Sequence, residues 1–487
     1  MPAMKKLLSS LGICLLLFAP PGASVAETSP ADAAPQARRV VLKPTEKLQR
    51  LDGWGVSLCW WANMCGRWSE AKVDSLVNML VSPDGLNYNV FRYNIPGGED
   101  PQNRNCKKHH MASGKGLRAE MDGFKDYPTD SYDWSRDEAQ RRIMLKIRER
   151  RPDAVFEAFS NTPPYFMTYS GCCGGAVKAT DDNLRTECYE DFARYLLDVC
   201  QHYKERYGLE FKTLEPFNEP ETDYWYANGS QEGCHFSIPS MIKFVKVLSP
   251  MLKASGLKTV LSLTDETSVE QSVKDYKAFR ADPEAFRAIG QWNVHTYKAD
   301  SASRTELRRL VAADGLTLWM SETGEGGSGL KGNLALAQRM FDDLRQLQPA
   351  VWCDWQVMEE NNDQWCTVRG SFADGSFHRV KNYYVRRQIT GFIKQGYTLL
   401  STTDAQTLAA LSPAADSLVI VCLNNGDGSR NYEIDTRSLG SLKGTPQAWV
   451  TDSSRDCAKC ASPKAKGGIL SLNLPAQSIM TAVVRLK

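Results

Sequence analysis

Eight short apolar runs, separated by amphipathic helical patterns, constrain the fold of this chain more than any other feature of its sequence. The predicted strands are Trp54–Trp60, Asn89–Ile95, Ala154–Ser160, Thr213–Asn218, Thr259–Thr264, Trp292–Tyr297, Thr317–Ser321 and Ala350–Val357. The clearest helix carries Phe192, Leu196, Val199 and Tyr203 at three- and four-residue spacing. Such alternation predicts an α/β fold of the (β/α)8, or TIM-barrel, type. The alternative is an open doubly wound sheet, but no glycine-rich nucleotide-binding loop follows a strand, which favours the barrel.

The pattern changes after about residue 396. Short β-like runs separated by Gly, Asn, Asp, Ser and Pro replace the helical patterns: Leu418–Leu423, Gln447–Thr451, Ile469–Leu474 and Ile479–Leu486. They predict an antiparallel β-sandwich, which the lone strand Val40–Leu42 could join from the other end of the chain. We therefore expect an N-terminal sandwich strand (40–50), a barrel (51–395) and a C-terminal sandwich (396–487).

The N-terminus has the pattern of an export signal. Lys5 and Lys6 precede an apolar run, Leu7–Phe18, that is too short to span a bilayer, and small residues follow up to Ala26. We expect a signal peptide over residues 1–26 and an Ala/Pro/Ser-rich linker over 27–39, and hence a secreted or periplasmic protein. The alternative, a lipid anchor at Cys14, is disfavoured by the bulky residue before it. Because no other run is long enough, we expect no membrane insertion.

Composition restricts the partners. The chain has 59 basic and 57 acidic residues, which argues against a nucleic acid as partner. Its 12 tryptophans suit stacking on an uncharged ligand such as a sugar ring. No set of residues has metal-ligand spacing: Cys106, His109 and His110 lie in a polar loop without it, and we expect neither metal nor cofactor.

The cysteine count is unusual for an exported chain. Loss of Cys14 with the signal peptide would leave 13 of the 14 cysteines, an odd number, so at least one is unpaired or pairs between chains. Cys457 and Cys460 could form a small disulfide loop.

Two carboxylates occupy the positions where barrels place their chemistry, the C-terminal ends of the strands. Glu219 follows the fourth strand and Glu322 the seventh. Glycoside cleavage requires such a pair, at about 5–5.5 Å for retention of configuration and about 6.5–9.5 Å for inversion. A lone glutamate at a strand end is usually structural, but Asn-Glu-Pro after strand four with Ser-Glu at strand seven predicts catalysis.

The other strand ends supply candidate substrate-binding residues. They are Trp60, Trp61, Arg92, Tyr165, Asn218, His295, Tyr297 and Trp355. The aromatic rings are candidates for stacking on sugar, although each could serve only for packing, and His295 could be a structural histidine. Four further glutamates nearby are expected to be rim charges: Glu221, Glu325, Glu359 and Glu360.

Together these residues resemble glycoside hydrolase family 30, a family of retaining enzymes built from a barrel and a sandwich. The similarity runs from about Leu51 to the C-terminus. It is carried by Gly53-Trp54-Gly55, Ser160-Asn161-Thr162-Pro163-Pro164-Tyr165-Phe166-Met167, Asn218-Glu219-Pro220, Ser321-Glu322-Thr323 and Leu474-Pro475-Ala476-Gln477-Ser478. Within the family, the segments from Asp52 to Ala62 and from Gln231 to His235 look like the endo-β-1,6-galactanase branch.

The resemblance implies roles for individual residues. Glu219 would be the general acid/base, Glu322 the nucleophile, and Asn218 the group that binds the sugar 2-hydroxyl. The central subsite would be walled by Tyr165, Tyr297 and Trp355. Many relatives have Trp at the position of Tyr165, and this departure bears on the substrate more than on the mechanism.

The expected function is therefore that of a monomeric, secreted, retaining β-glycoside hydrolase that cleaves β-1,6-galactan internally. The partner is a polysaccharide or oligosaccharide, and Arg92 or His295 would recognise the axial 4-hydroxyl of galactose. A β-1,6-glucanase or a glucosylceramidase-like β-glucosidase is the alternative enzyme. A non-catalytic carbohydrate-binding protein is the alternative from another class, but such a protein would be expected to lose one of the two glutamates.

Overall fold

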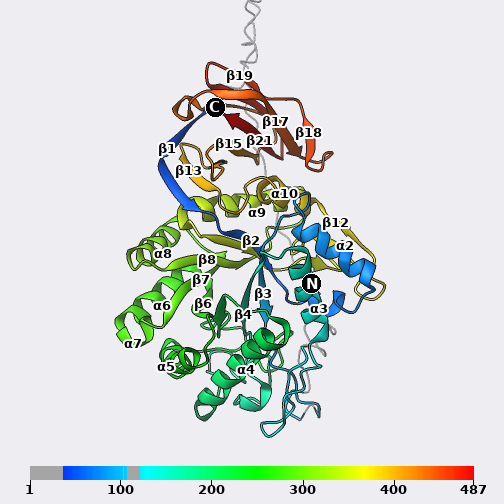
Figure 1. Cartoon of the computed structure of the whole chain (residues 1–487), viewed down its shortest axis with the longest axis vertical. Helices are drawn as coiled ribbons and strands as arrows, with labels where there is room; N and C mark the ends of the chain where they lie inside the picture. Colours follow the sequence, from blue (N-terminus) through cyan, green and yellow to red (C-terminus); the bar gives the residue numbers. More distant parts are fainter. Residues whose placement is uncertain (1–36, 103, 107–120) are drawn as a thin grey trace, which may run out of the picture. The chain divides into compact units, whose positions relative to one another are not determined.

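The eight predicted strands form a closed parallel barrel in the computed structural model, which describes residues 37–102, 104–106 and 121–487 (Figure 1). The barrel strands are β2 (Gly53–Ser57), β3 (Val90–Asn94), β4 (Val155–Phe159), β5 (Thr213–Glu215), β6 (Val260–Ser268), β7 (Ile289–Lys298), β8 (Thr317–Thr323) and β9 (Val351–Asp354). The ladder between β9 and β2 closes the ring. The predicted fold class is thus confirmed. The predicted signal peptide, linker residues 27–36, His109 and His110 lie outside the described residues.

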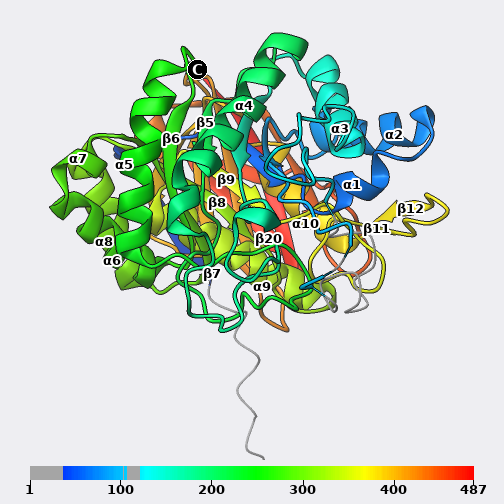
Figure 2. The ribbon, with the colours of Figure 1, turned by 90° about the horizontal axis from the view of Figure 1, so that it is seen from below.

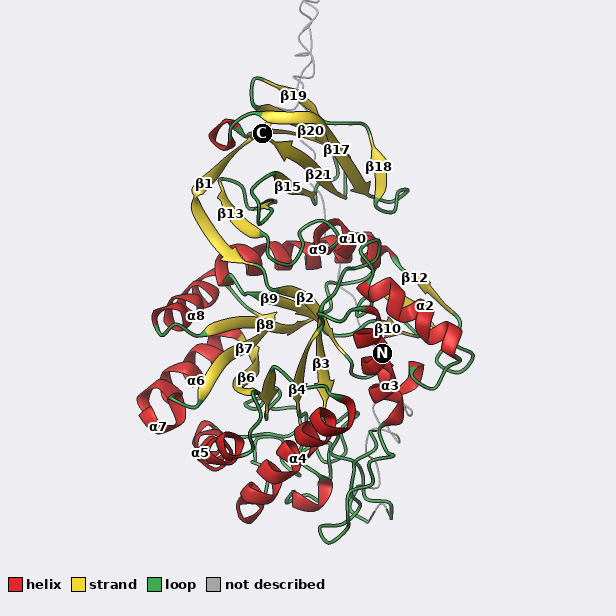
Figure 3. Ribbon diagram, in the orientation of Figure 1, coloured by secondary structure: helices red, strands yellow, loops and turns green. Residues whose placement is uncertain are grey.

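Helices surround the strands, as Figure 3 shows. They are α1 (Trp61–Cys65), α2 (Glu70–Val81), α3 (Glu138–Arg150), α4 (Tyr189–Tyr207), α5 (Ile238–Ala254), α6 (Val269–Ala281), α7 (Pro283–Phe286), α8 (Ser301–Ala313), α9 (Gly329–Asp342) and α10 (Lys381–Thr390). In the described part of the chain, none of them is long and apolar enough to cross a membrane.

Helix α4 shows how the sequence determines these elements. Its apolar positions from Phe192 to Tyr203 are buried, acidic residues lie in its first turn and basic residues in its last turn. That charge distribution is favourable in the field of the helix dipole. The helix ends at Gly208, whose φ of 62° is left-handed and costs glycine no steric strain.

The sandwich uses strands from both ends of the chain. It contains β1 (Arg38–Arg50), β13 (Thr398–Thr402), β14 (Thr407–Leu411), β15 (Ser417–Asn424), β16 (Arg430–Asp435), β17 (Leu442–Thr451), β18 (Ala458–Cys460), β19 (Lys464–Lys466), β20 (Ile469–Leu474) and β21 (Ser478–Leu486). Strand β1 lies between β13 and β16, so the N-terminal strand does join the sandwich. It begins at Arg38, so residues 38 and 39 belong to the strand and not to the predicted linker.

One pairing differs from the antiparallel expectation. Strand β1 is antiparallel to β13 but parallel to β16. The other ladders of this sheet are antiparallel. No hairpin connects β1 to β16, since it reaches the sandwich from the opposite end of the chain, and its direction is therefore not set by a tight turn.

Buried polar contacts and apolar packing join the sandwich to the barrel. The Gln388 side-chain amide in α10 donates to Thr451 Oγ1 at 3.0 Å, and Thr481 Oγ1 donates to Gln388 Oε1 at 2.6 Å. All three side chains are buried. Apolar residues of β14 and β15, among them Leu408 and Val421, belong to the same core as the barrel helices.

A small sheet that the sequence analysis did not predict follows the last barrel strand. It consists of β10 (Met358–Glu359), β11 (Val368–Gly370) and β12 (Phe377–Arg379). Figure 2 shows it on the side of the barrel that carries α1 and α2. Trp68, between those helices, holds it there: its indole N–H donates to Phe372 O at 2.9 Å and its ring stacks on Phe377 at 5.6 Å.

Candidate active site

The two predicted glutamates meet at the mouth of the barrel. Glu219 lies in the loop after β5, and Glu322 is the next-to-last residue of β8, which ends at Thr323. A carboxylate oxygen of each lies within 4.8 Å of one on the other. Glu219 has a left-handed φ of 50°, and its backbone N–H donates to Asp265 O at 3.0 Å. A non-glycine residue held in this region carries strain, which surrounding contacts must offset.

Glu322 is surrounded by groups that stabilise its anion. Arg92 donates from Nη1 to its Oε2 at 2.8 Å, and the Tyr297 hydroxyl donates to its Oε1 at 3.0 Å. Burial raises the pKa of the Glu322 carboxyl above its ordinary value, while the charges of His295 and Arg92 act in the opposite direction. The two cations therefore offset part of the cost of charging this buried carboxyl.

Arg92 lies behind the glutamates and is fully buried. Its Nε donates to Glu157 Oε1 at 3.0 Å, and its Nη2 is paired with Asp265. Its hydrogen-bonding groups face Glu322 and the carboxylates behind it. Arg92 is therefore placed to hold Glu322, and the substrate contact predicted for it stays a prediction.

His295 lies between the two glutamates. Its Nδ1 is 3.1 Å from Glu219 Oε1 and 3.7 Å from Glu322 Oε1, and its Nε2 is 3.7 Å from Asp265 Oδ1. Burial disfavours the charged imidazolium. The three carboxylates around the ring outweigh that effect and raise the pKa of His295 to about 10. His295 has no exposed surface, and the sugar contact predicted for it stays a prediction.

Glu219, His295 and Glu322 also have the donor atoms of a metal site, all within 4.8 Å of one another. The chemistry of the set does not fit one. A protonated imidazole has no lone pair for a metal, and Arg92 already supplies a cation to Glu322.

A cleft of about 770 Å³ opens above these residues. Residues that line it include Asn218, Glu219, Tyr224, Tyr297, Glu322, Trp355, Gln356, Glu359, Glu360 and Trp365. The cleft therefore combines carboxylates, amides and aromatic faces, as carbohydrate sites do.

The predicted aromatic wall lines the cleft in part. Tyr297 and Trp355 line the cleft. Trp60 is fully buried and packs edge-on against Trp355 at 6.0 Å, so it supports that ring without reaching the cleft. Trp61 is also fully buried, and its indole N–H donates to Ser57 O at 2.8 Å. Neither tryptophan lines the cleft, and the sugar contacts predicted for them stay predictions.

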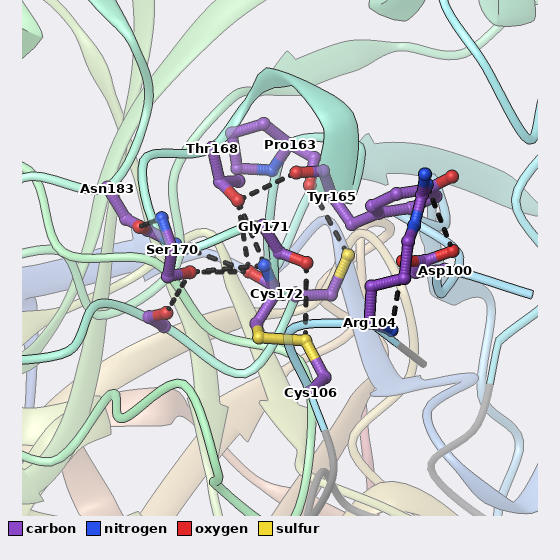
Figure 4. The surroundings of a disulfide bond; sticks show 12 residues. Asp100, Arg104, Cys106, Pro163, Tyr165, Thr168, Ser170, Gly171, Cys172 and Asn183 are labelled. Carbon is purple, nitrogen blue, oxygen red and sulfur yellow. Dashed lines mark hydrogen bonds and ion pairs between the residues drawn. A yellow bond between two sulfur atoms is a disulfide. The ribbon is translucent and has the colours of Figure 1, made fainter. Parts of the chain in front are cut away.

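Tyr165, also predicted to contact sugar, does not line the cleft either. Its side chain is almost fully buried, and its hydroxyl donates to Asp126 O. It lies in the loop after β4, which a disulfide ties to the loop after β3 (Figure 4). Cys106 and Cys172 form that disulfide, and both cysteines are buried. Cys457 and Cys460, expected as a possible pair, are both free thiols.

Three residues that line the cleft were not predicted as binding groups: Trp365, Gln356 and Glu359. Tyr224 also lines it and belongs to the segment Tyr224-Trp225-Tyr226, which the sequence predicts to supply an aromatic surface beside Glu219. The Tyr224 hydroxyl donates to Glu219 Oε2, and Trp365 lies 6.1 Å from the Tyr297 ring. Gln356 and Glu359 follow β9, and Glu359 is buried instead of lying on the exposed rim. Tyr224 lies five residues after Glu219, and Gln356 lies beside Trp355. These positions are the sequence signals that point to the two residues.

The fold and this cleft define a glycoside hydrolase, and comparisons with known proteins identify the family. Residues 37–307, more than half of the chain, match O-glycosyl hydrolase family 30, and the chain belongs to that family. It is 28% identical to an endo-β-1,6-galactanase of Hypocrea rufa over 85% of this chain and 87% of that one. It is 24% identical to an exo-β-1,6-galactobiohydrolase of Bifidobacterium longum subsp. longum over 80% of this chain, but spans only 34% of that longer protein.

Solved structures show the same fold at low identity. A conserved exported protein from Bacteroides fragilis superposes with a TM-score of 0.78 at 17% identity, over 92% of this chain and 100% of that one. The endo-β1,6-glucanase BT3312 superposes with a TM-score of 0.64 at 17% identity, over 93% and 96%. At this identity the similarity establishes the fold alone.

Proposed function

We propose that this glycoside hydrolase retains anomeric configuration and that Glu219 and Glu322 carry its two-step mechanism. The observation that supports this is the distance between them: carboxylate oxygens within 4.8 Å. Retaining enzymes place the pair at about 5–5.5 Å, whereas inverting enzymes need about 6.5–9.5 Å to admit a water molecule.

In the first step Glu322 attacks the anomeric carbon as Glu219 donates its proton to the departing glycosidic oxygen. One C–O bond forms to the enzyme and one breaks to the leaving sugar. In the second step Glu219 takes a proton from water, the hydroxide attacks the same carbon from the opposite face to Glu322, and the Glu322 carboxylate leaves. Two displacements restore the original configuration.

The surroundings of the two glutamates support this division of roles. Glu322 accepts from the Arg92 guanidinium and the Tyr297 hydroxyl, contacts that favour a charged nucleophile. Glu219 has no ion pair with lysine or arginine in the described chain, and its neighbours are the Tyr224 hydroxyl and His295. His295 contacts both glutamates, so it can stabilise whichever one is charged at each step.

For the substrate we propose β-1,6-galactan, cleaved within the chain. The Hypocrea rufa relative has that activity in its name, and the motifs from Asp52 to Ala62 and Gln231 to His235 look like the same branch. A cleft of about 770 Å³ with aromatic rings at Trp355, Trp365 and Tyr224 offers more than one stacking position for the sugars of a chain. Cleavage from a chain end or of β-1,6-glucan are the alternatives, since relatives and structural neighbours include both.

The test is a time course on β-1,6-galactan, β-1,6-glucan and xylan, with product size and anomeric configuration followed by chromatography and NMR. We expect galactan to be cut fastest, a mixture of oligosaccharides at the earliest points, and β-anomers as the first products. Faster cleavage of β-1,6-glucan would overturn the substrate, a single small product from the start would overturn internal cleavage, and α-anomers would overturn retention.

We also propose that the chain is exported and acts as a monomer. The sequence of residues 1–26 supports export, and a structural neighbour is described as an exported protein. N-terminal sequencing of protein recovered outside the cytoplasm should begin after Ala26, and light scattering should give the mass of one chain.

A further inference from the structure

The cleft contains a buried acceptor that no described contact satisfies. Gln356 is 3% exposed, and its Oε1 has no hydrogen-bond partner in the described part of the protein. Its Nε2 donates to Glu359 Oε1, which fixes the orientation of the amide because a carboxylate accepts hydrogen bonds and does not donate them. A buried oxygen without a partner is costly, and one that lines a cleft is placed to accept a hydrogen bond from a ligand or from water.

Among the residues that line the cleft, one other buried side-chain oxygen lacks a partner, Asn218 Oδ1. Asn218 precedes Glu219 on the acid/base side. Gln356 comes from the opposite side: it follows Trp355, whose backbone N–H donates to Thr323 O at 2.8 Å, next to Glu322. Gln356 therefore lies on the Glu322 side of the cleft.

The groups first expected to recognise a hydroxyl are already paired within the protein. Arg92 and His295 are fully buried and engaged with carboxylates. Other polar groups of the cleft must then distinguish one sugar from another. A site that hydrogen-bonds a substrate hydroxyl rejects the epimer that leaves the site unpaired, and this is the strongest discrimination a binding site offers.

We propose that Gln356 is a specificity-determining residue: its Oε1 accepts a hydrogen bond from the 4-hydroxyl of the sugar attacked by Glu322, and so favours galactose over glucose. Glu359 is a positioning residue that holds the Gln356 amide in this orientation. This assignment rests on the proposed galactan activity, because an enzyme selective for galactan needs a group that recognises the 4-hydroxyl of galactose.

The test uses two aryl glycosides, those of β-1,6-galactobiose and of its β-1,6-linked glucose counterpart, which differ only in configuration at C4 of each sugar. Gln356→Met keeps the length of the side chain and removes the acceptor. We expect kcat/KM to fall about tenfold on the galacto substrate, the order of one lost hydrogen bond, and less than about twofold on the gluco substrate. The ratio of the two rates therefore falls.

Two further variants control the result. Gln364→Met changes a glutamine of the same loop that bonds Ser328 outside the cleft, and should leave the ratio unchanged. Glu359→Gln should lower the ratio of galacto to gluco kcat/KM, as Gln356→Met does. If Gln356→Met fails to fold, the ratio measured for Glu359→Gln tests the assignment. Equal losses on both substrates, or none, would overturn the assignment. A wild-type preference for the gluco substrate would instead overturn the galactan proposal, so the two failures are distinguishable.

Discussion

Single residues carry the mechanism, and azide can separate the roles of the two glutamates. Glu322→Ala removes the proposed nucleophile and leaves space on that face, so azide should restore turnover of an activated aryl glycoside and give an α-glycosyl azide. Glu219→Ala keeps the nucleophile, so azide should trap the glycosyl-enzyme and give a β-glycosyl azide. NMR of the products measures both. The same azide anomer from both variants would contradict the assignment.

The protonation state of His295 is a second test at the residue scale. Its pKa of about 10 predicts an imidazolium at pH 8, whereas burial and nearby arginines lower the pKa of His202 and predict a neutral ring. ¹⁵N NMR distinguishes the two forms. A neutral His295 ring at pH 8 would show that the surrounding carboxylates are less charged than the structure implies.

The same pKa has a consequence for stability. The folded protein binds the His295 proton more tightly than the unfolded chain, whose histidine pKa is about 6.5. The stability that this contributes is complete below about pH 6.5 and is lost as pH rises through 10. Denaturation measured from pH 6 to 10 should show a smaller decline for His295→Phe than for the wild type.

At the scale of elements, the sequence predicted every barrel strand and both glutamates, because apolar periodicity and the strand-end rule are local signals. It did not predict Asp265. Strand β6 continues past its predicted end, with a register shift between Thr264 and Glu266 and a φ of 54° at Asp265. Such a bulge reorients the side chain toward Arg92, and no local pattern announces it.

The buried positions of two tryptophans predicted at the cleft have a similar cause. Trp60 and Trp61 are adjacent at a strand end, where the chain turns directly into α1. Both rings are therefore buried in the protein. The Trp61 ring lies at the start of the helix, and Trp355 packs against the Trp60 ring. Gln356 and Trp365 were not predicted because they lie in an irregular loop. Tertiary contacts, and not sequence periodicity, determine where the side chains of such a loop lie.

The disulfide between the loops after β3 and β4 gives an element-scale prediction. Cys106 and Cys172 are 66 residues apart, and the chain-entropy account gives such a bridge about 4 kcal/mol. Replacing both by serine should lower the free energy of unfolding by up to that amount in a denaturant titration. Cys460→Ser, at a partly exposed free thiol, is the matched control and should change little.

Thiol counting checks the pairing itself. The described residues contain eleven cysteines besides Cys106 and Cys172. With that bridge as the one disulfide, alkylation of the unfolded, unreduced protein without residues 1–26, and hence without Cys14, should label eleven sites, and two more after reduction. Fewer labels before reduction would reveal a second disulfide.

At the scale of the whole molecule, the sandwich is part of the folding unit and not an appendage. Residues 37–487 form one compact unit, and β1 enters the sandwich sheet before the barrel begins. Deleting residues 396–487 would expose the apolar face that packs on Leu408 and Val421 and would leave β1 without both neighbours. An exposed apolar face and an unpaired edge favour aggregation, so we expect an insoluble fragment.

Deleting only Arg38–Arg50 tests the same idea from the other end of the chain. Strands β13 and β16 would both lose their central partner, and the protein should lose cooperative unfolding and activity although the barrel and both glutamates remain. A chain that starts at Ala37 keeps β1 and is the matched control. Circular dichroism during thermal unfolding, with activity on galactan, measures the outcome. A soluble, cooperatively folded and active protein without β1 would mean that the barrel is stable by itself and that the sandwich has a separate function.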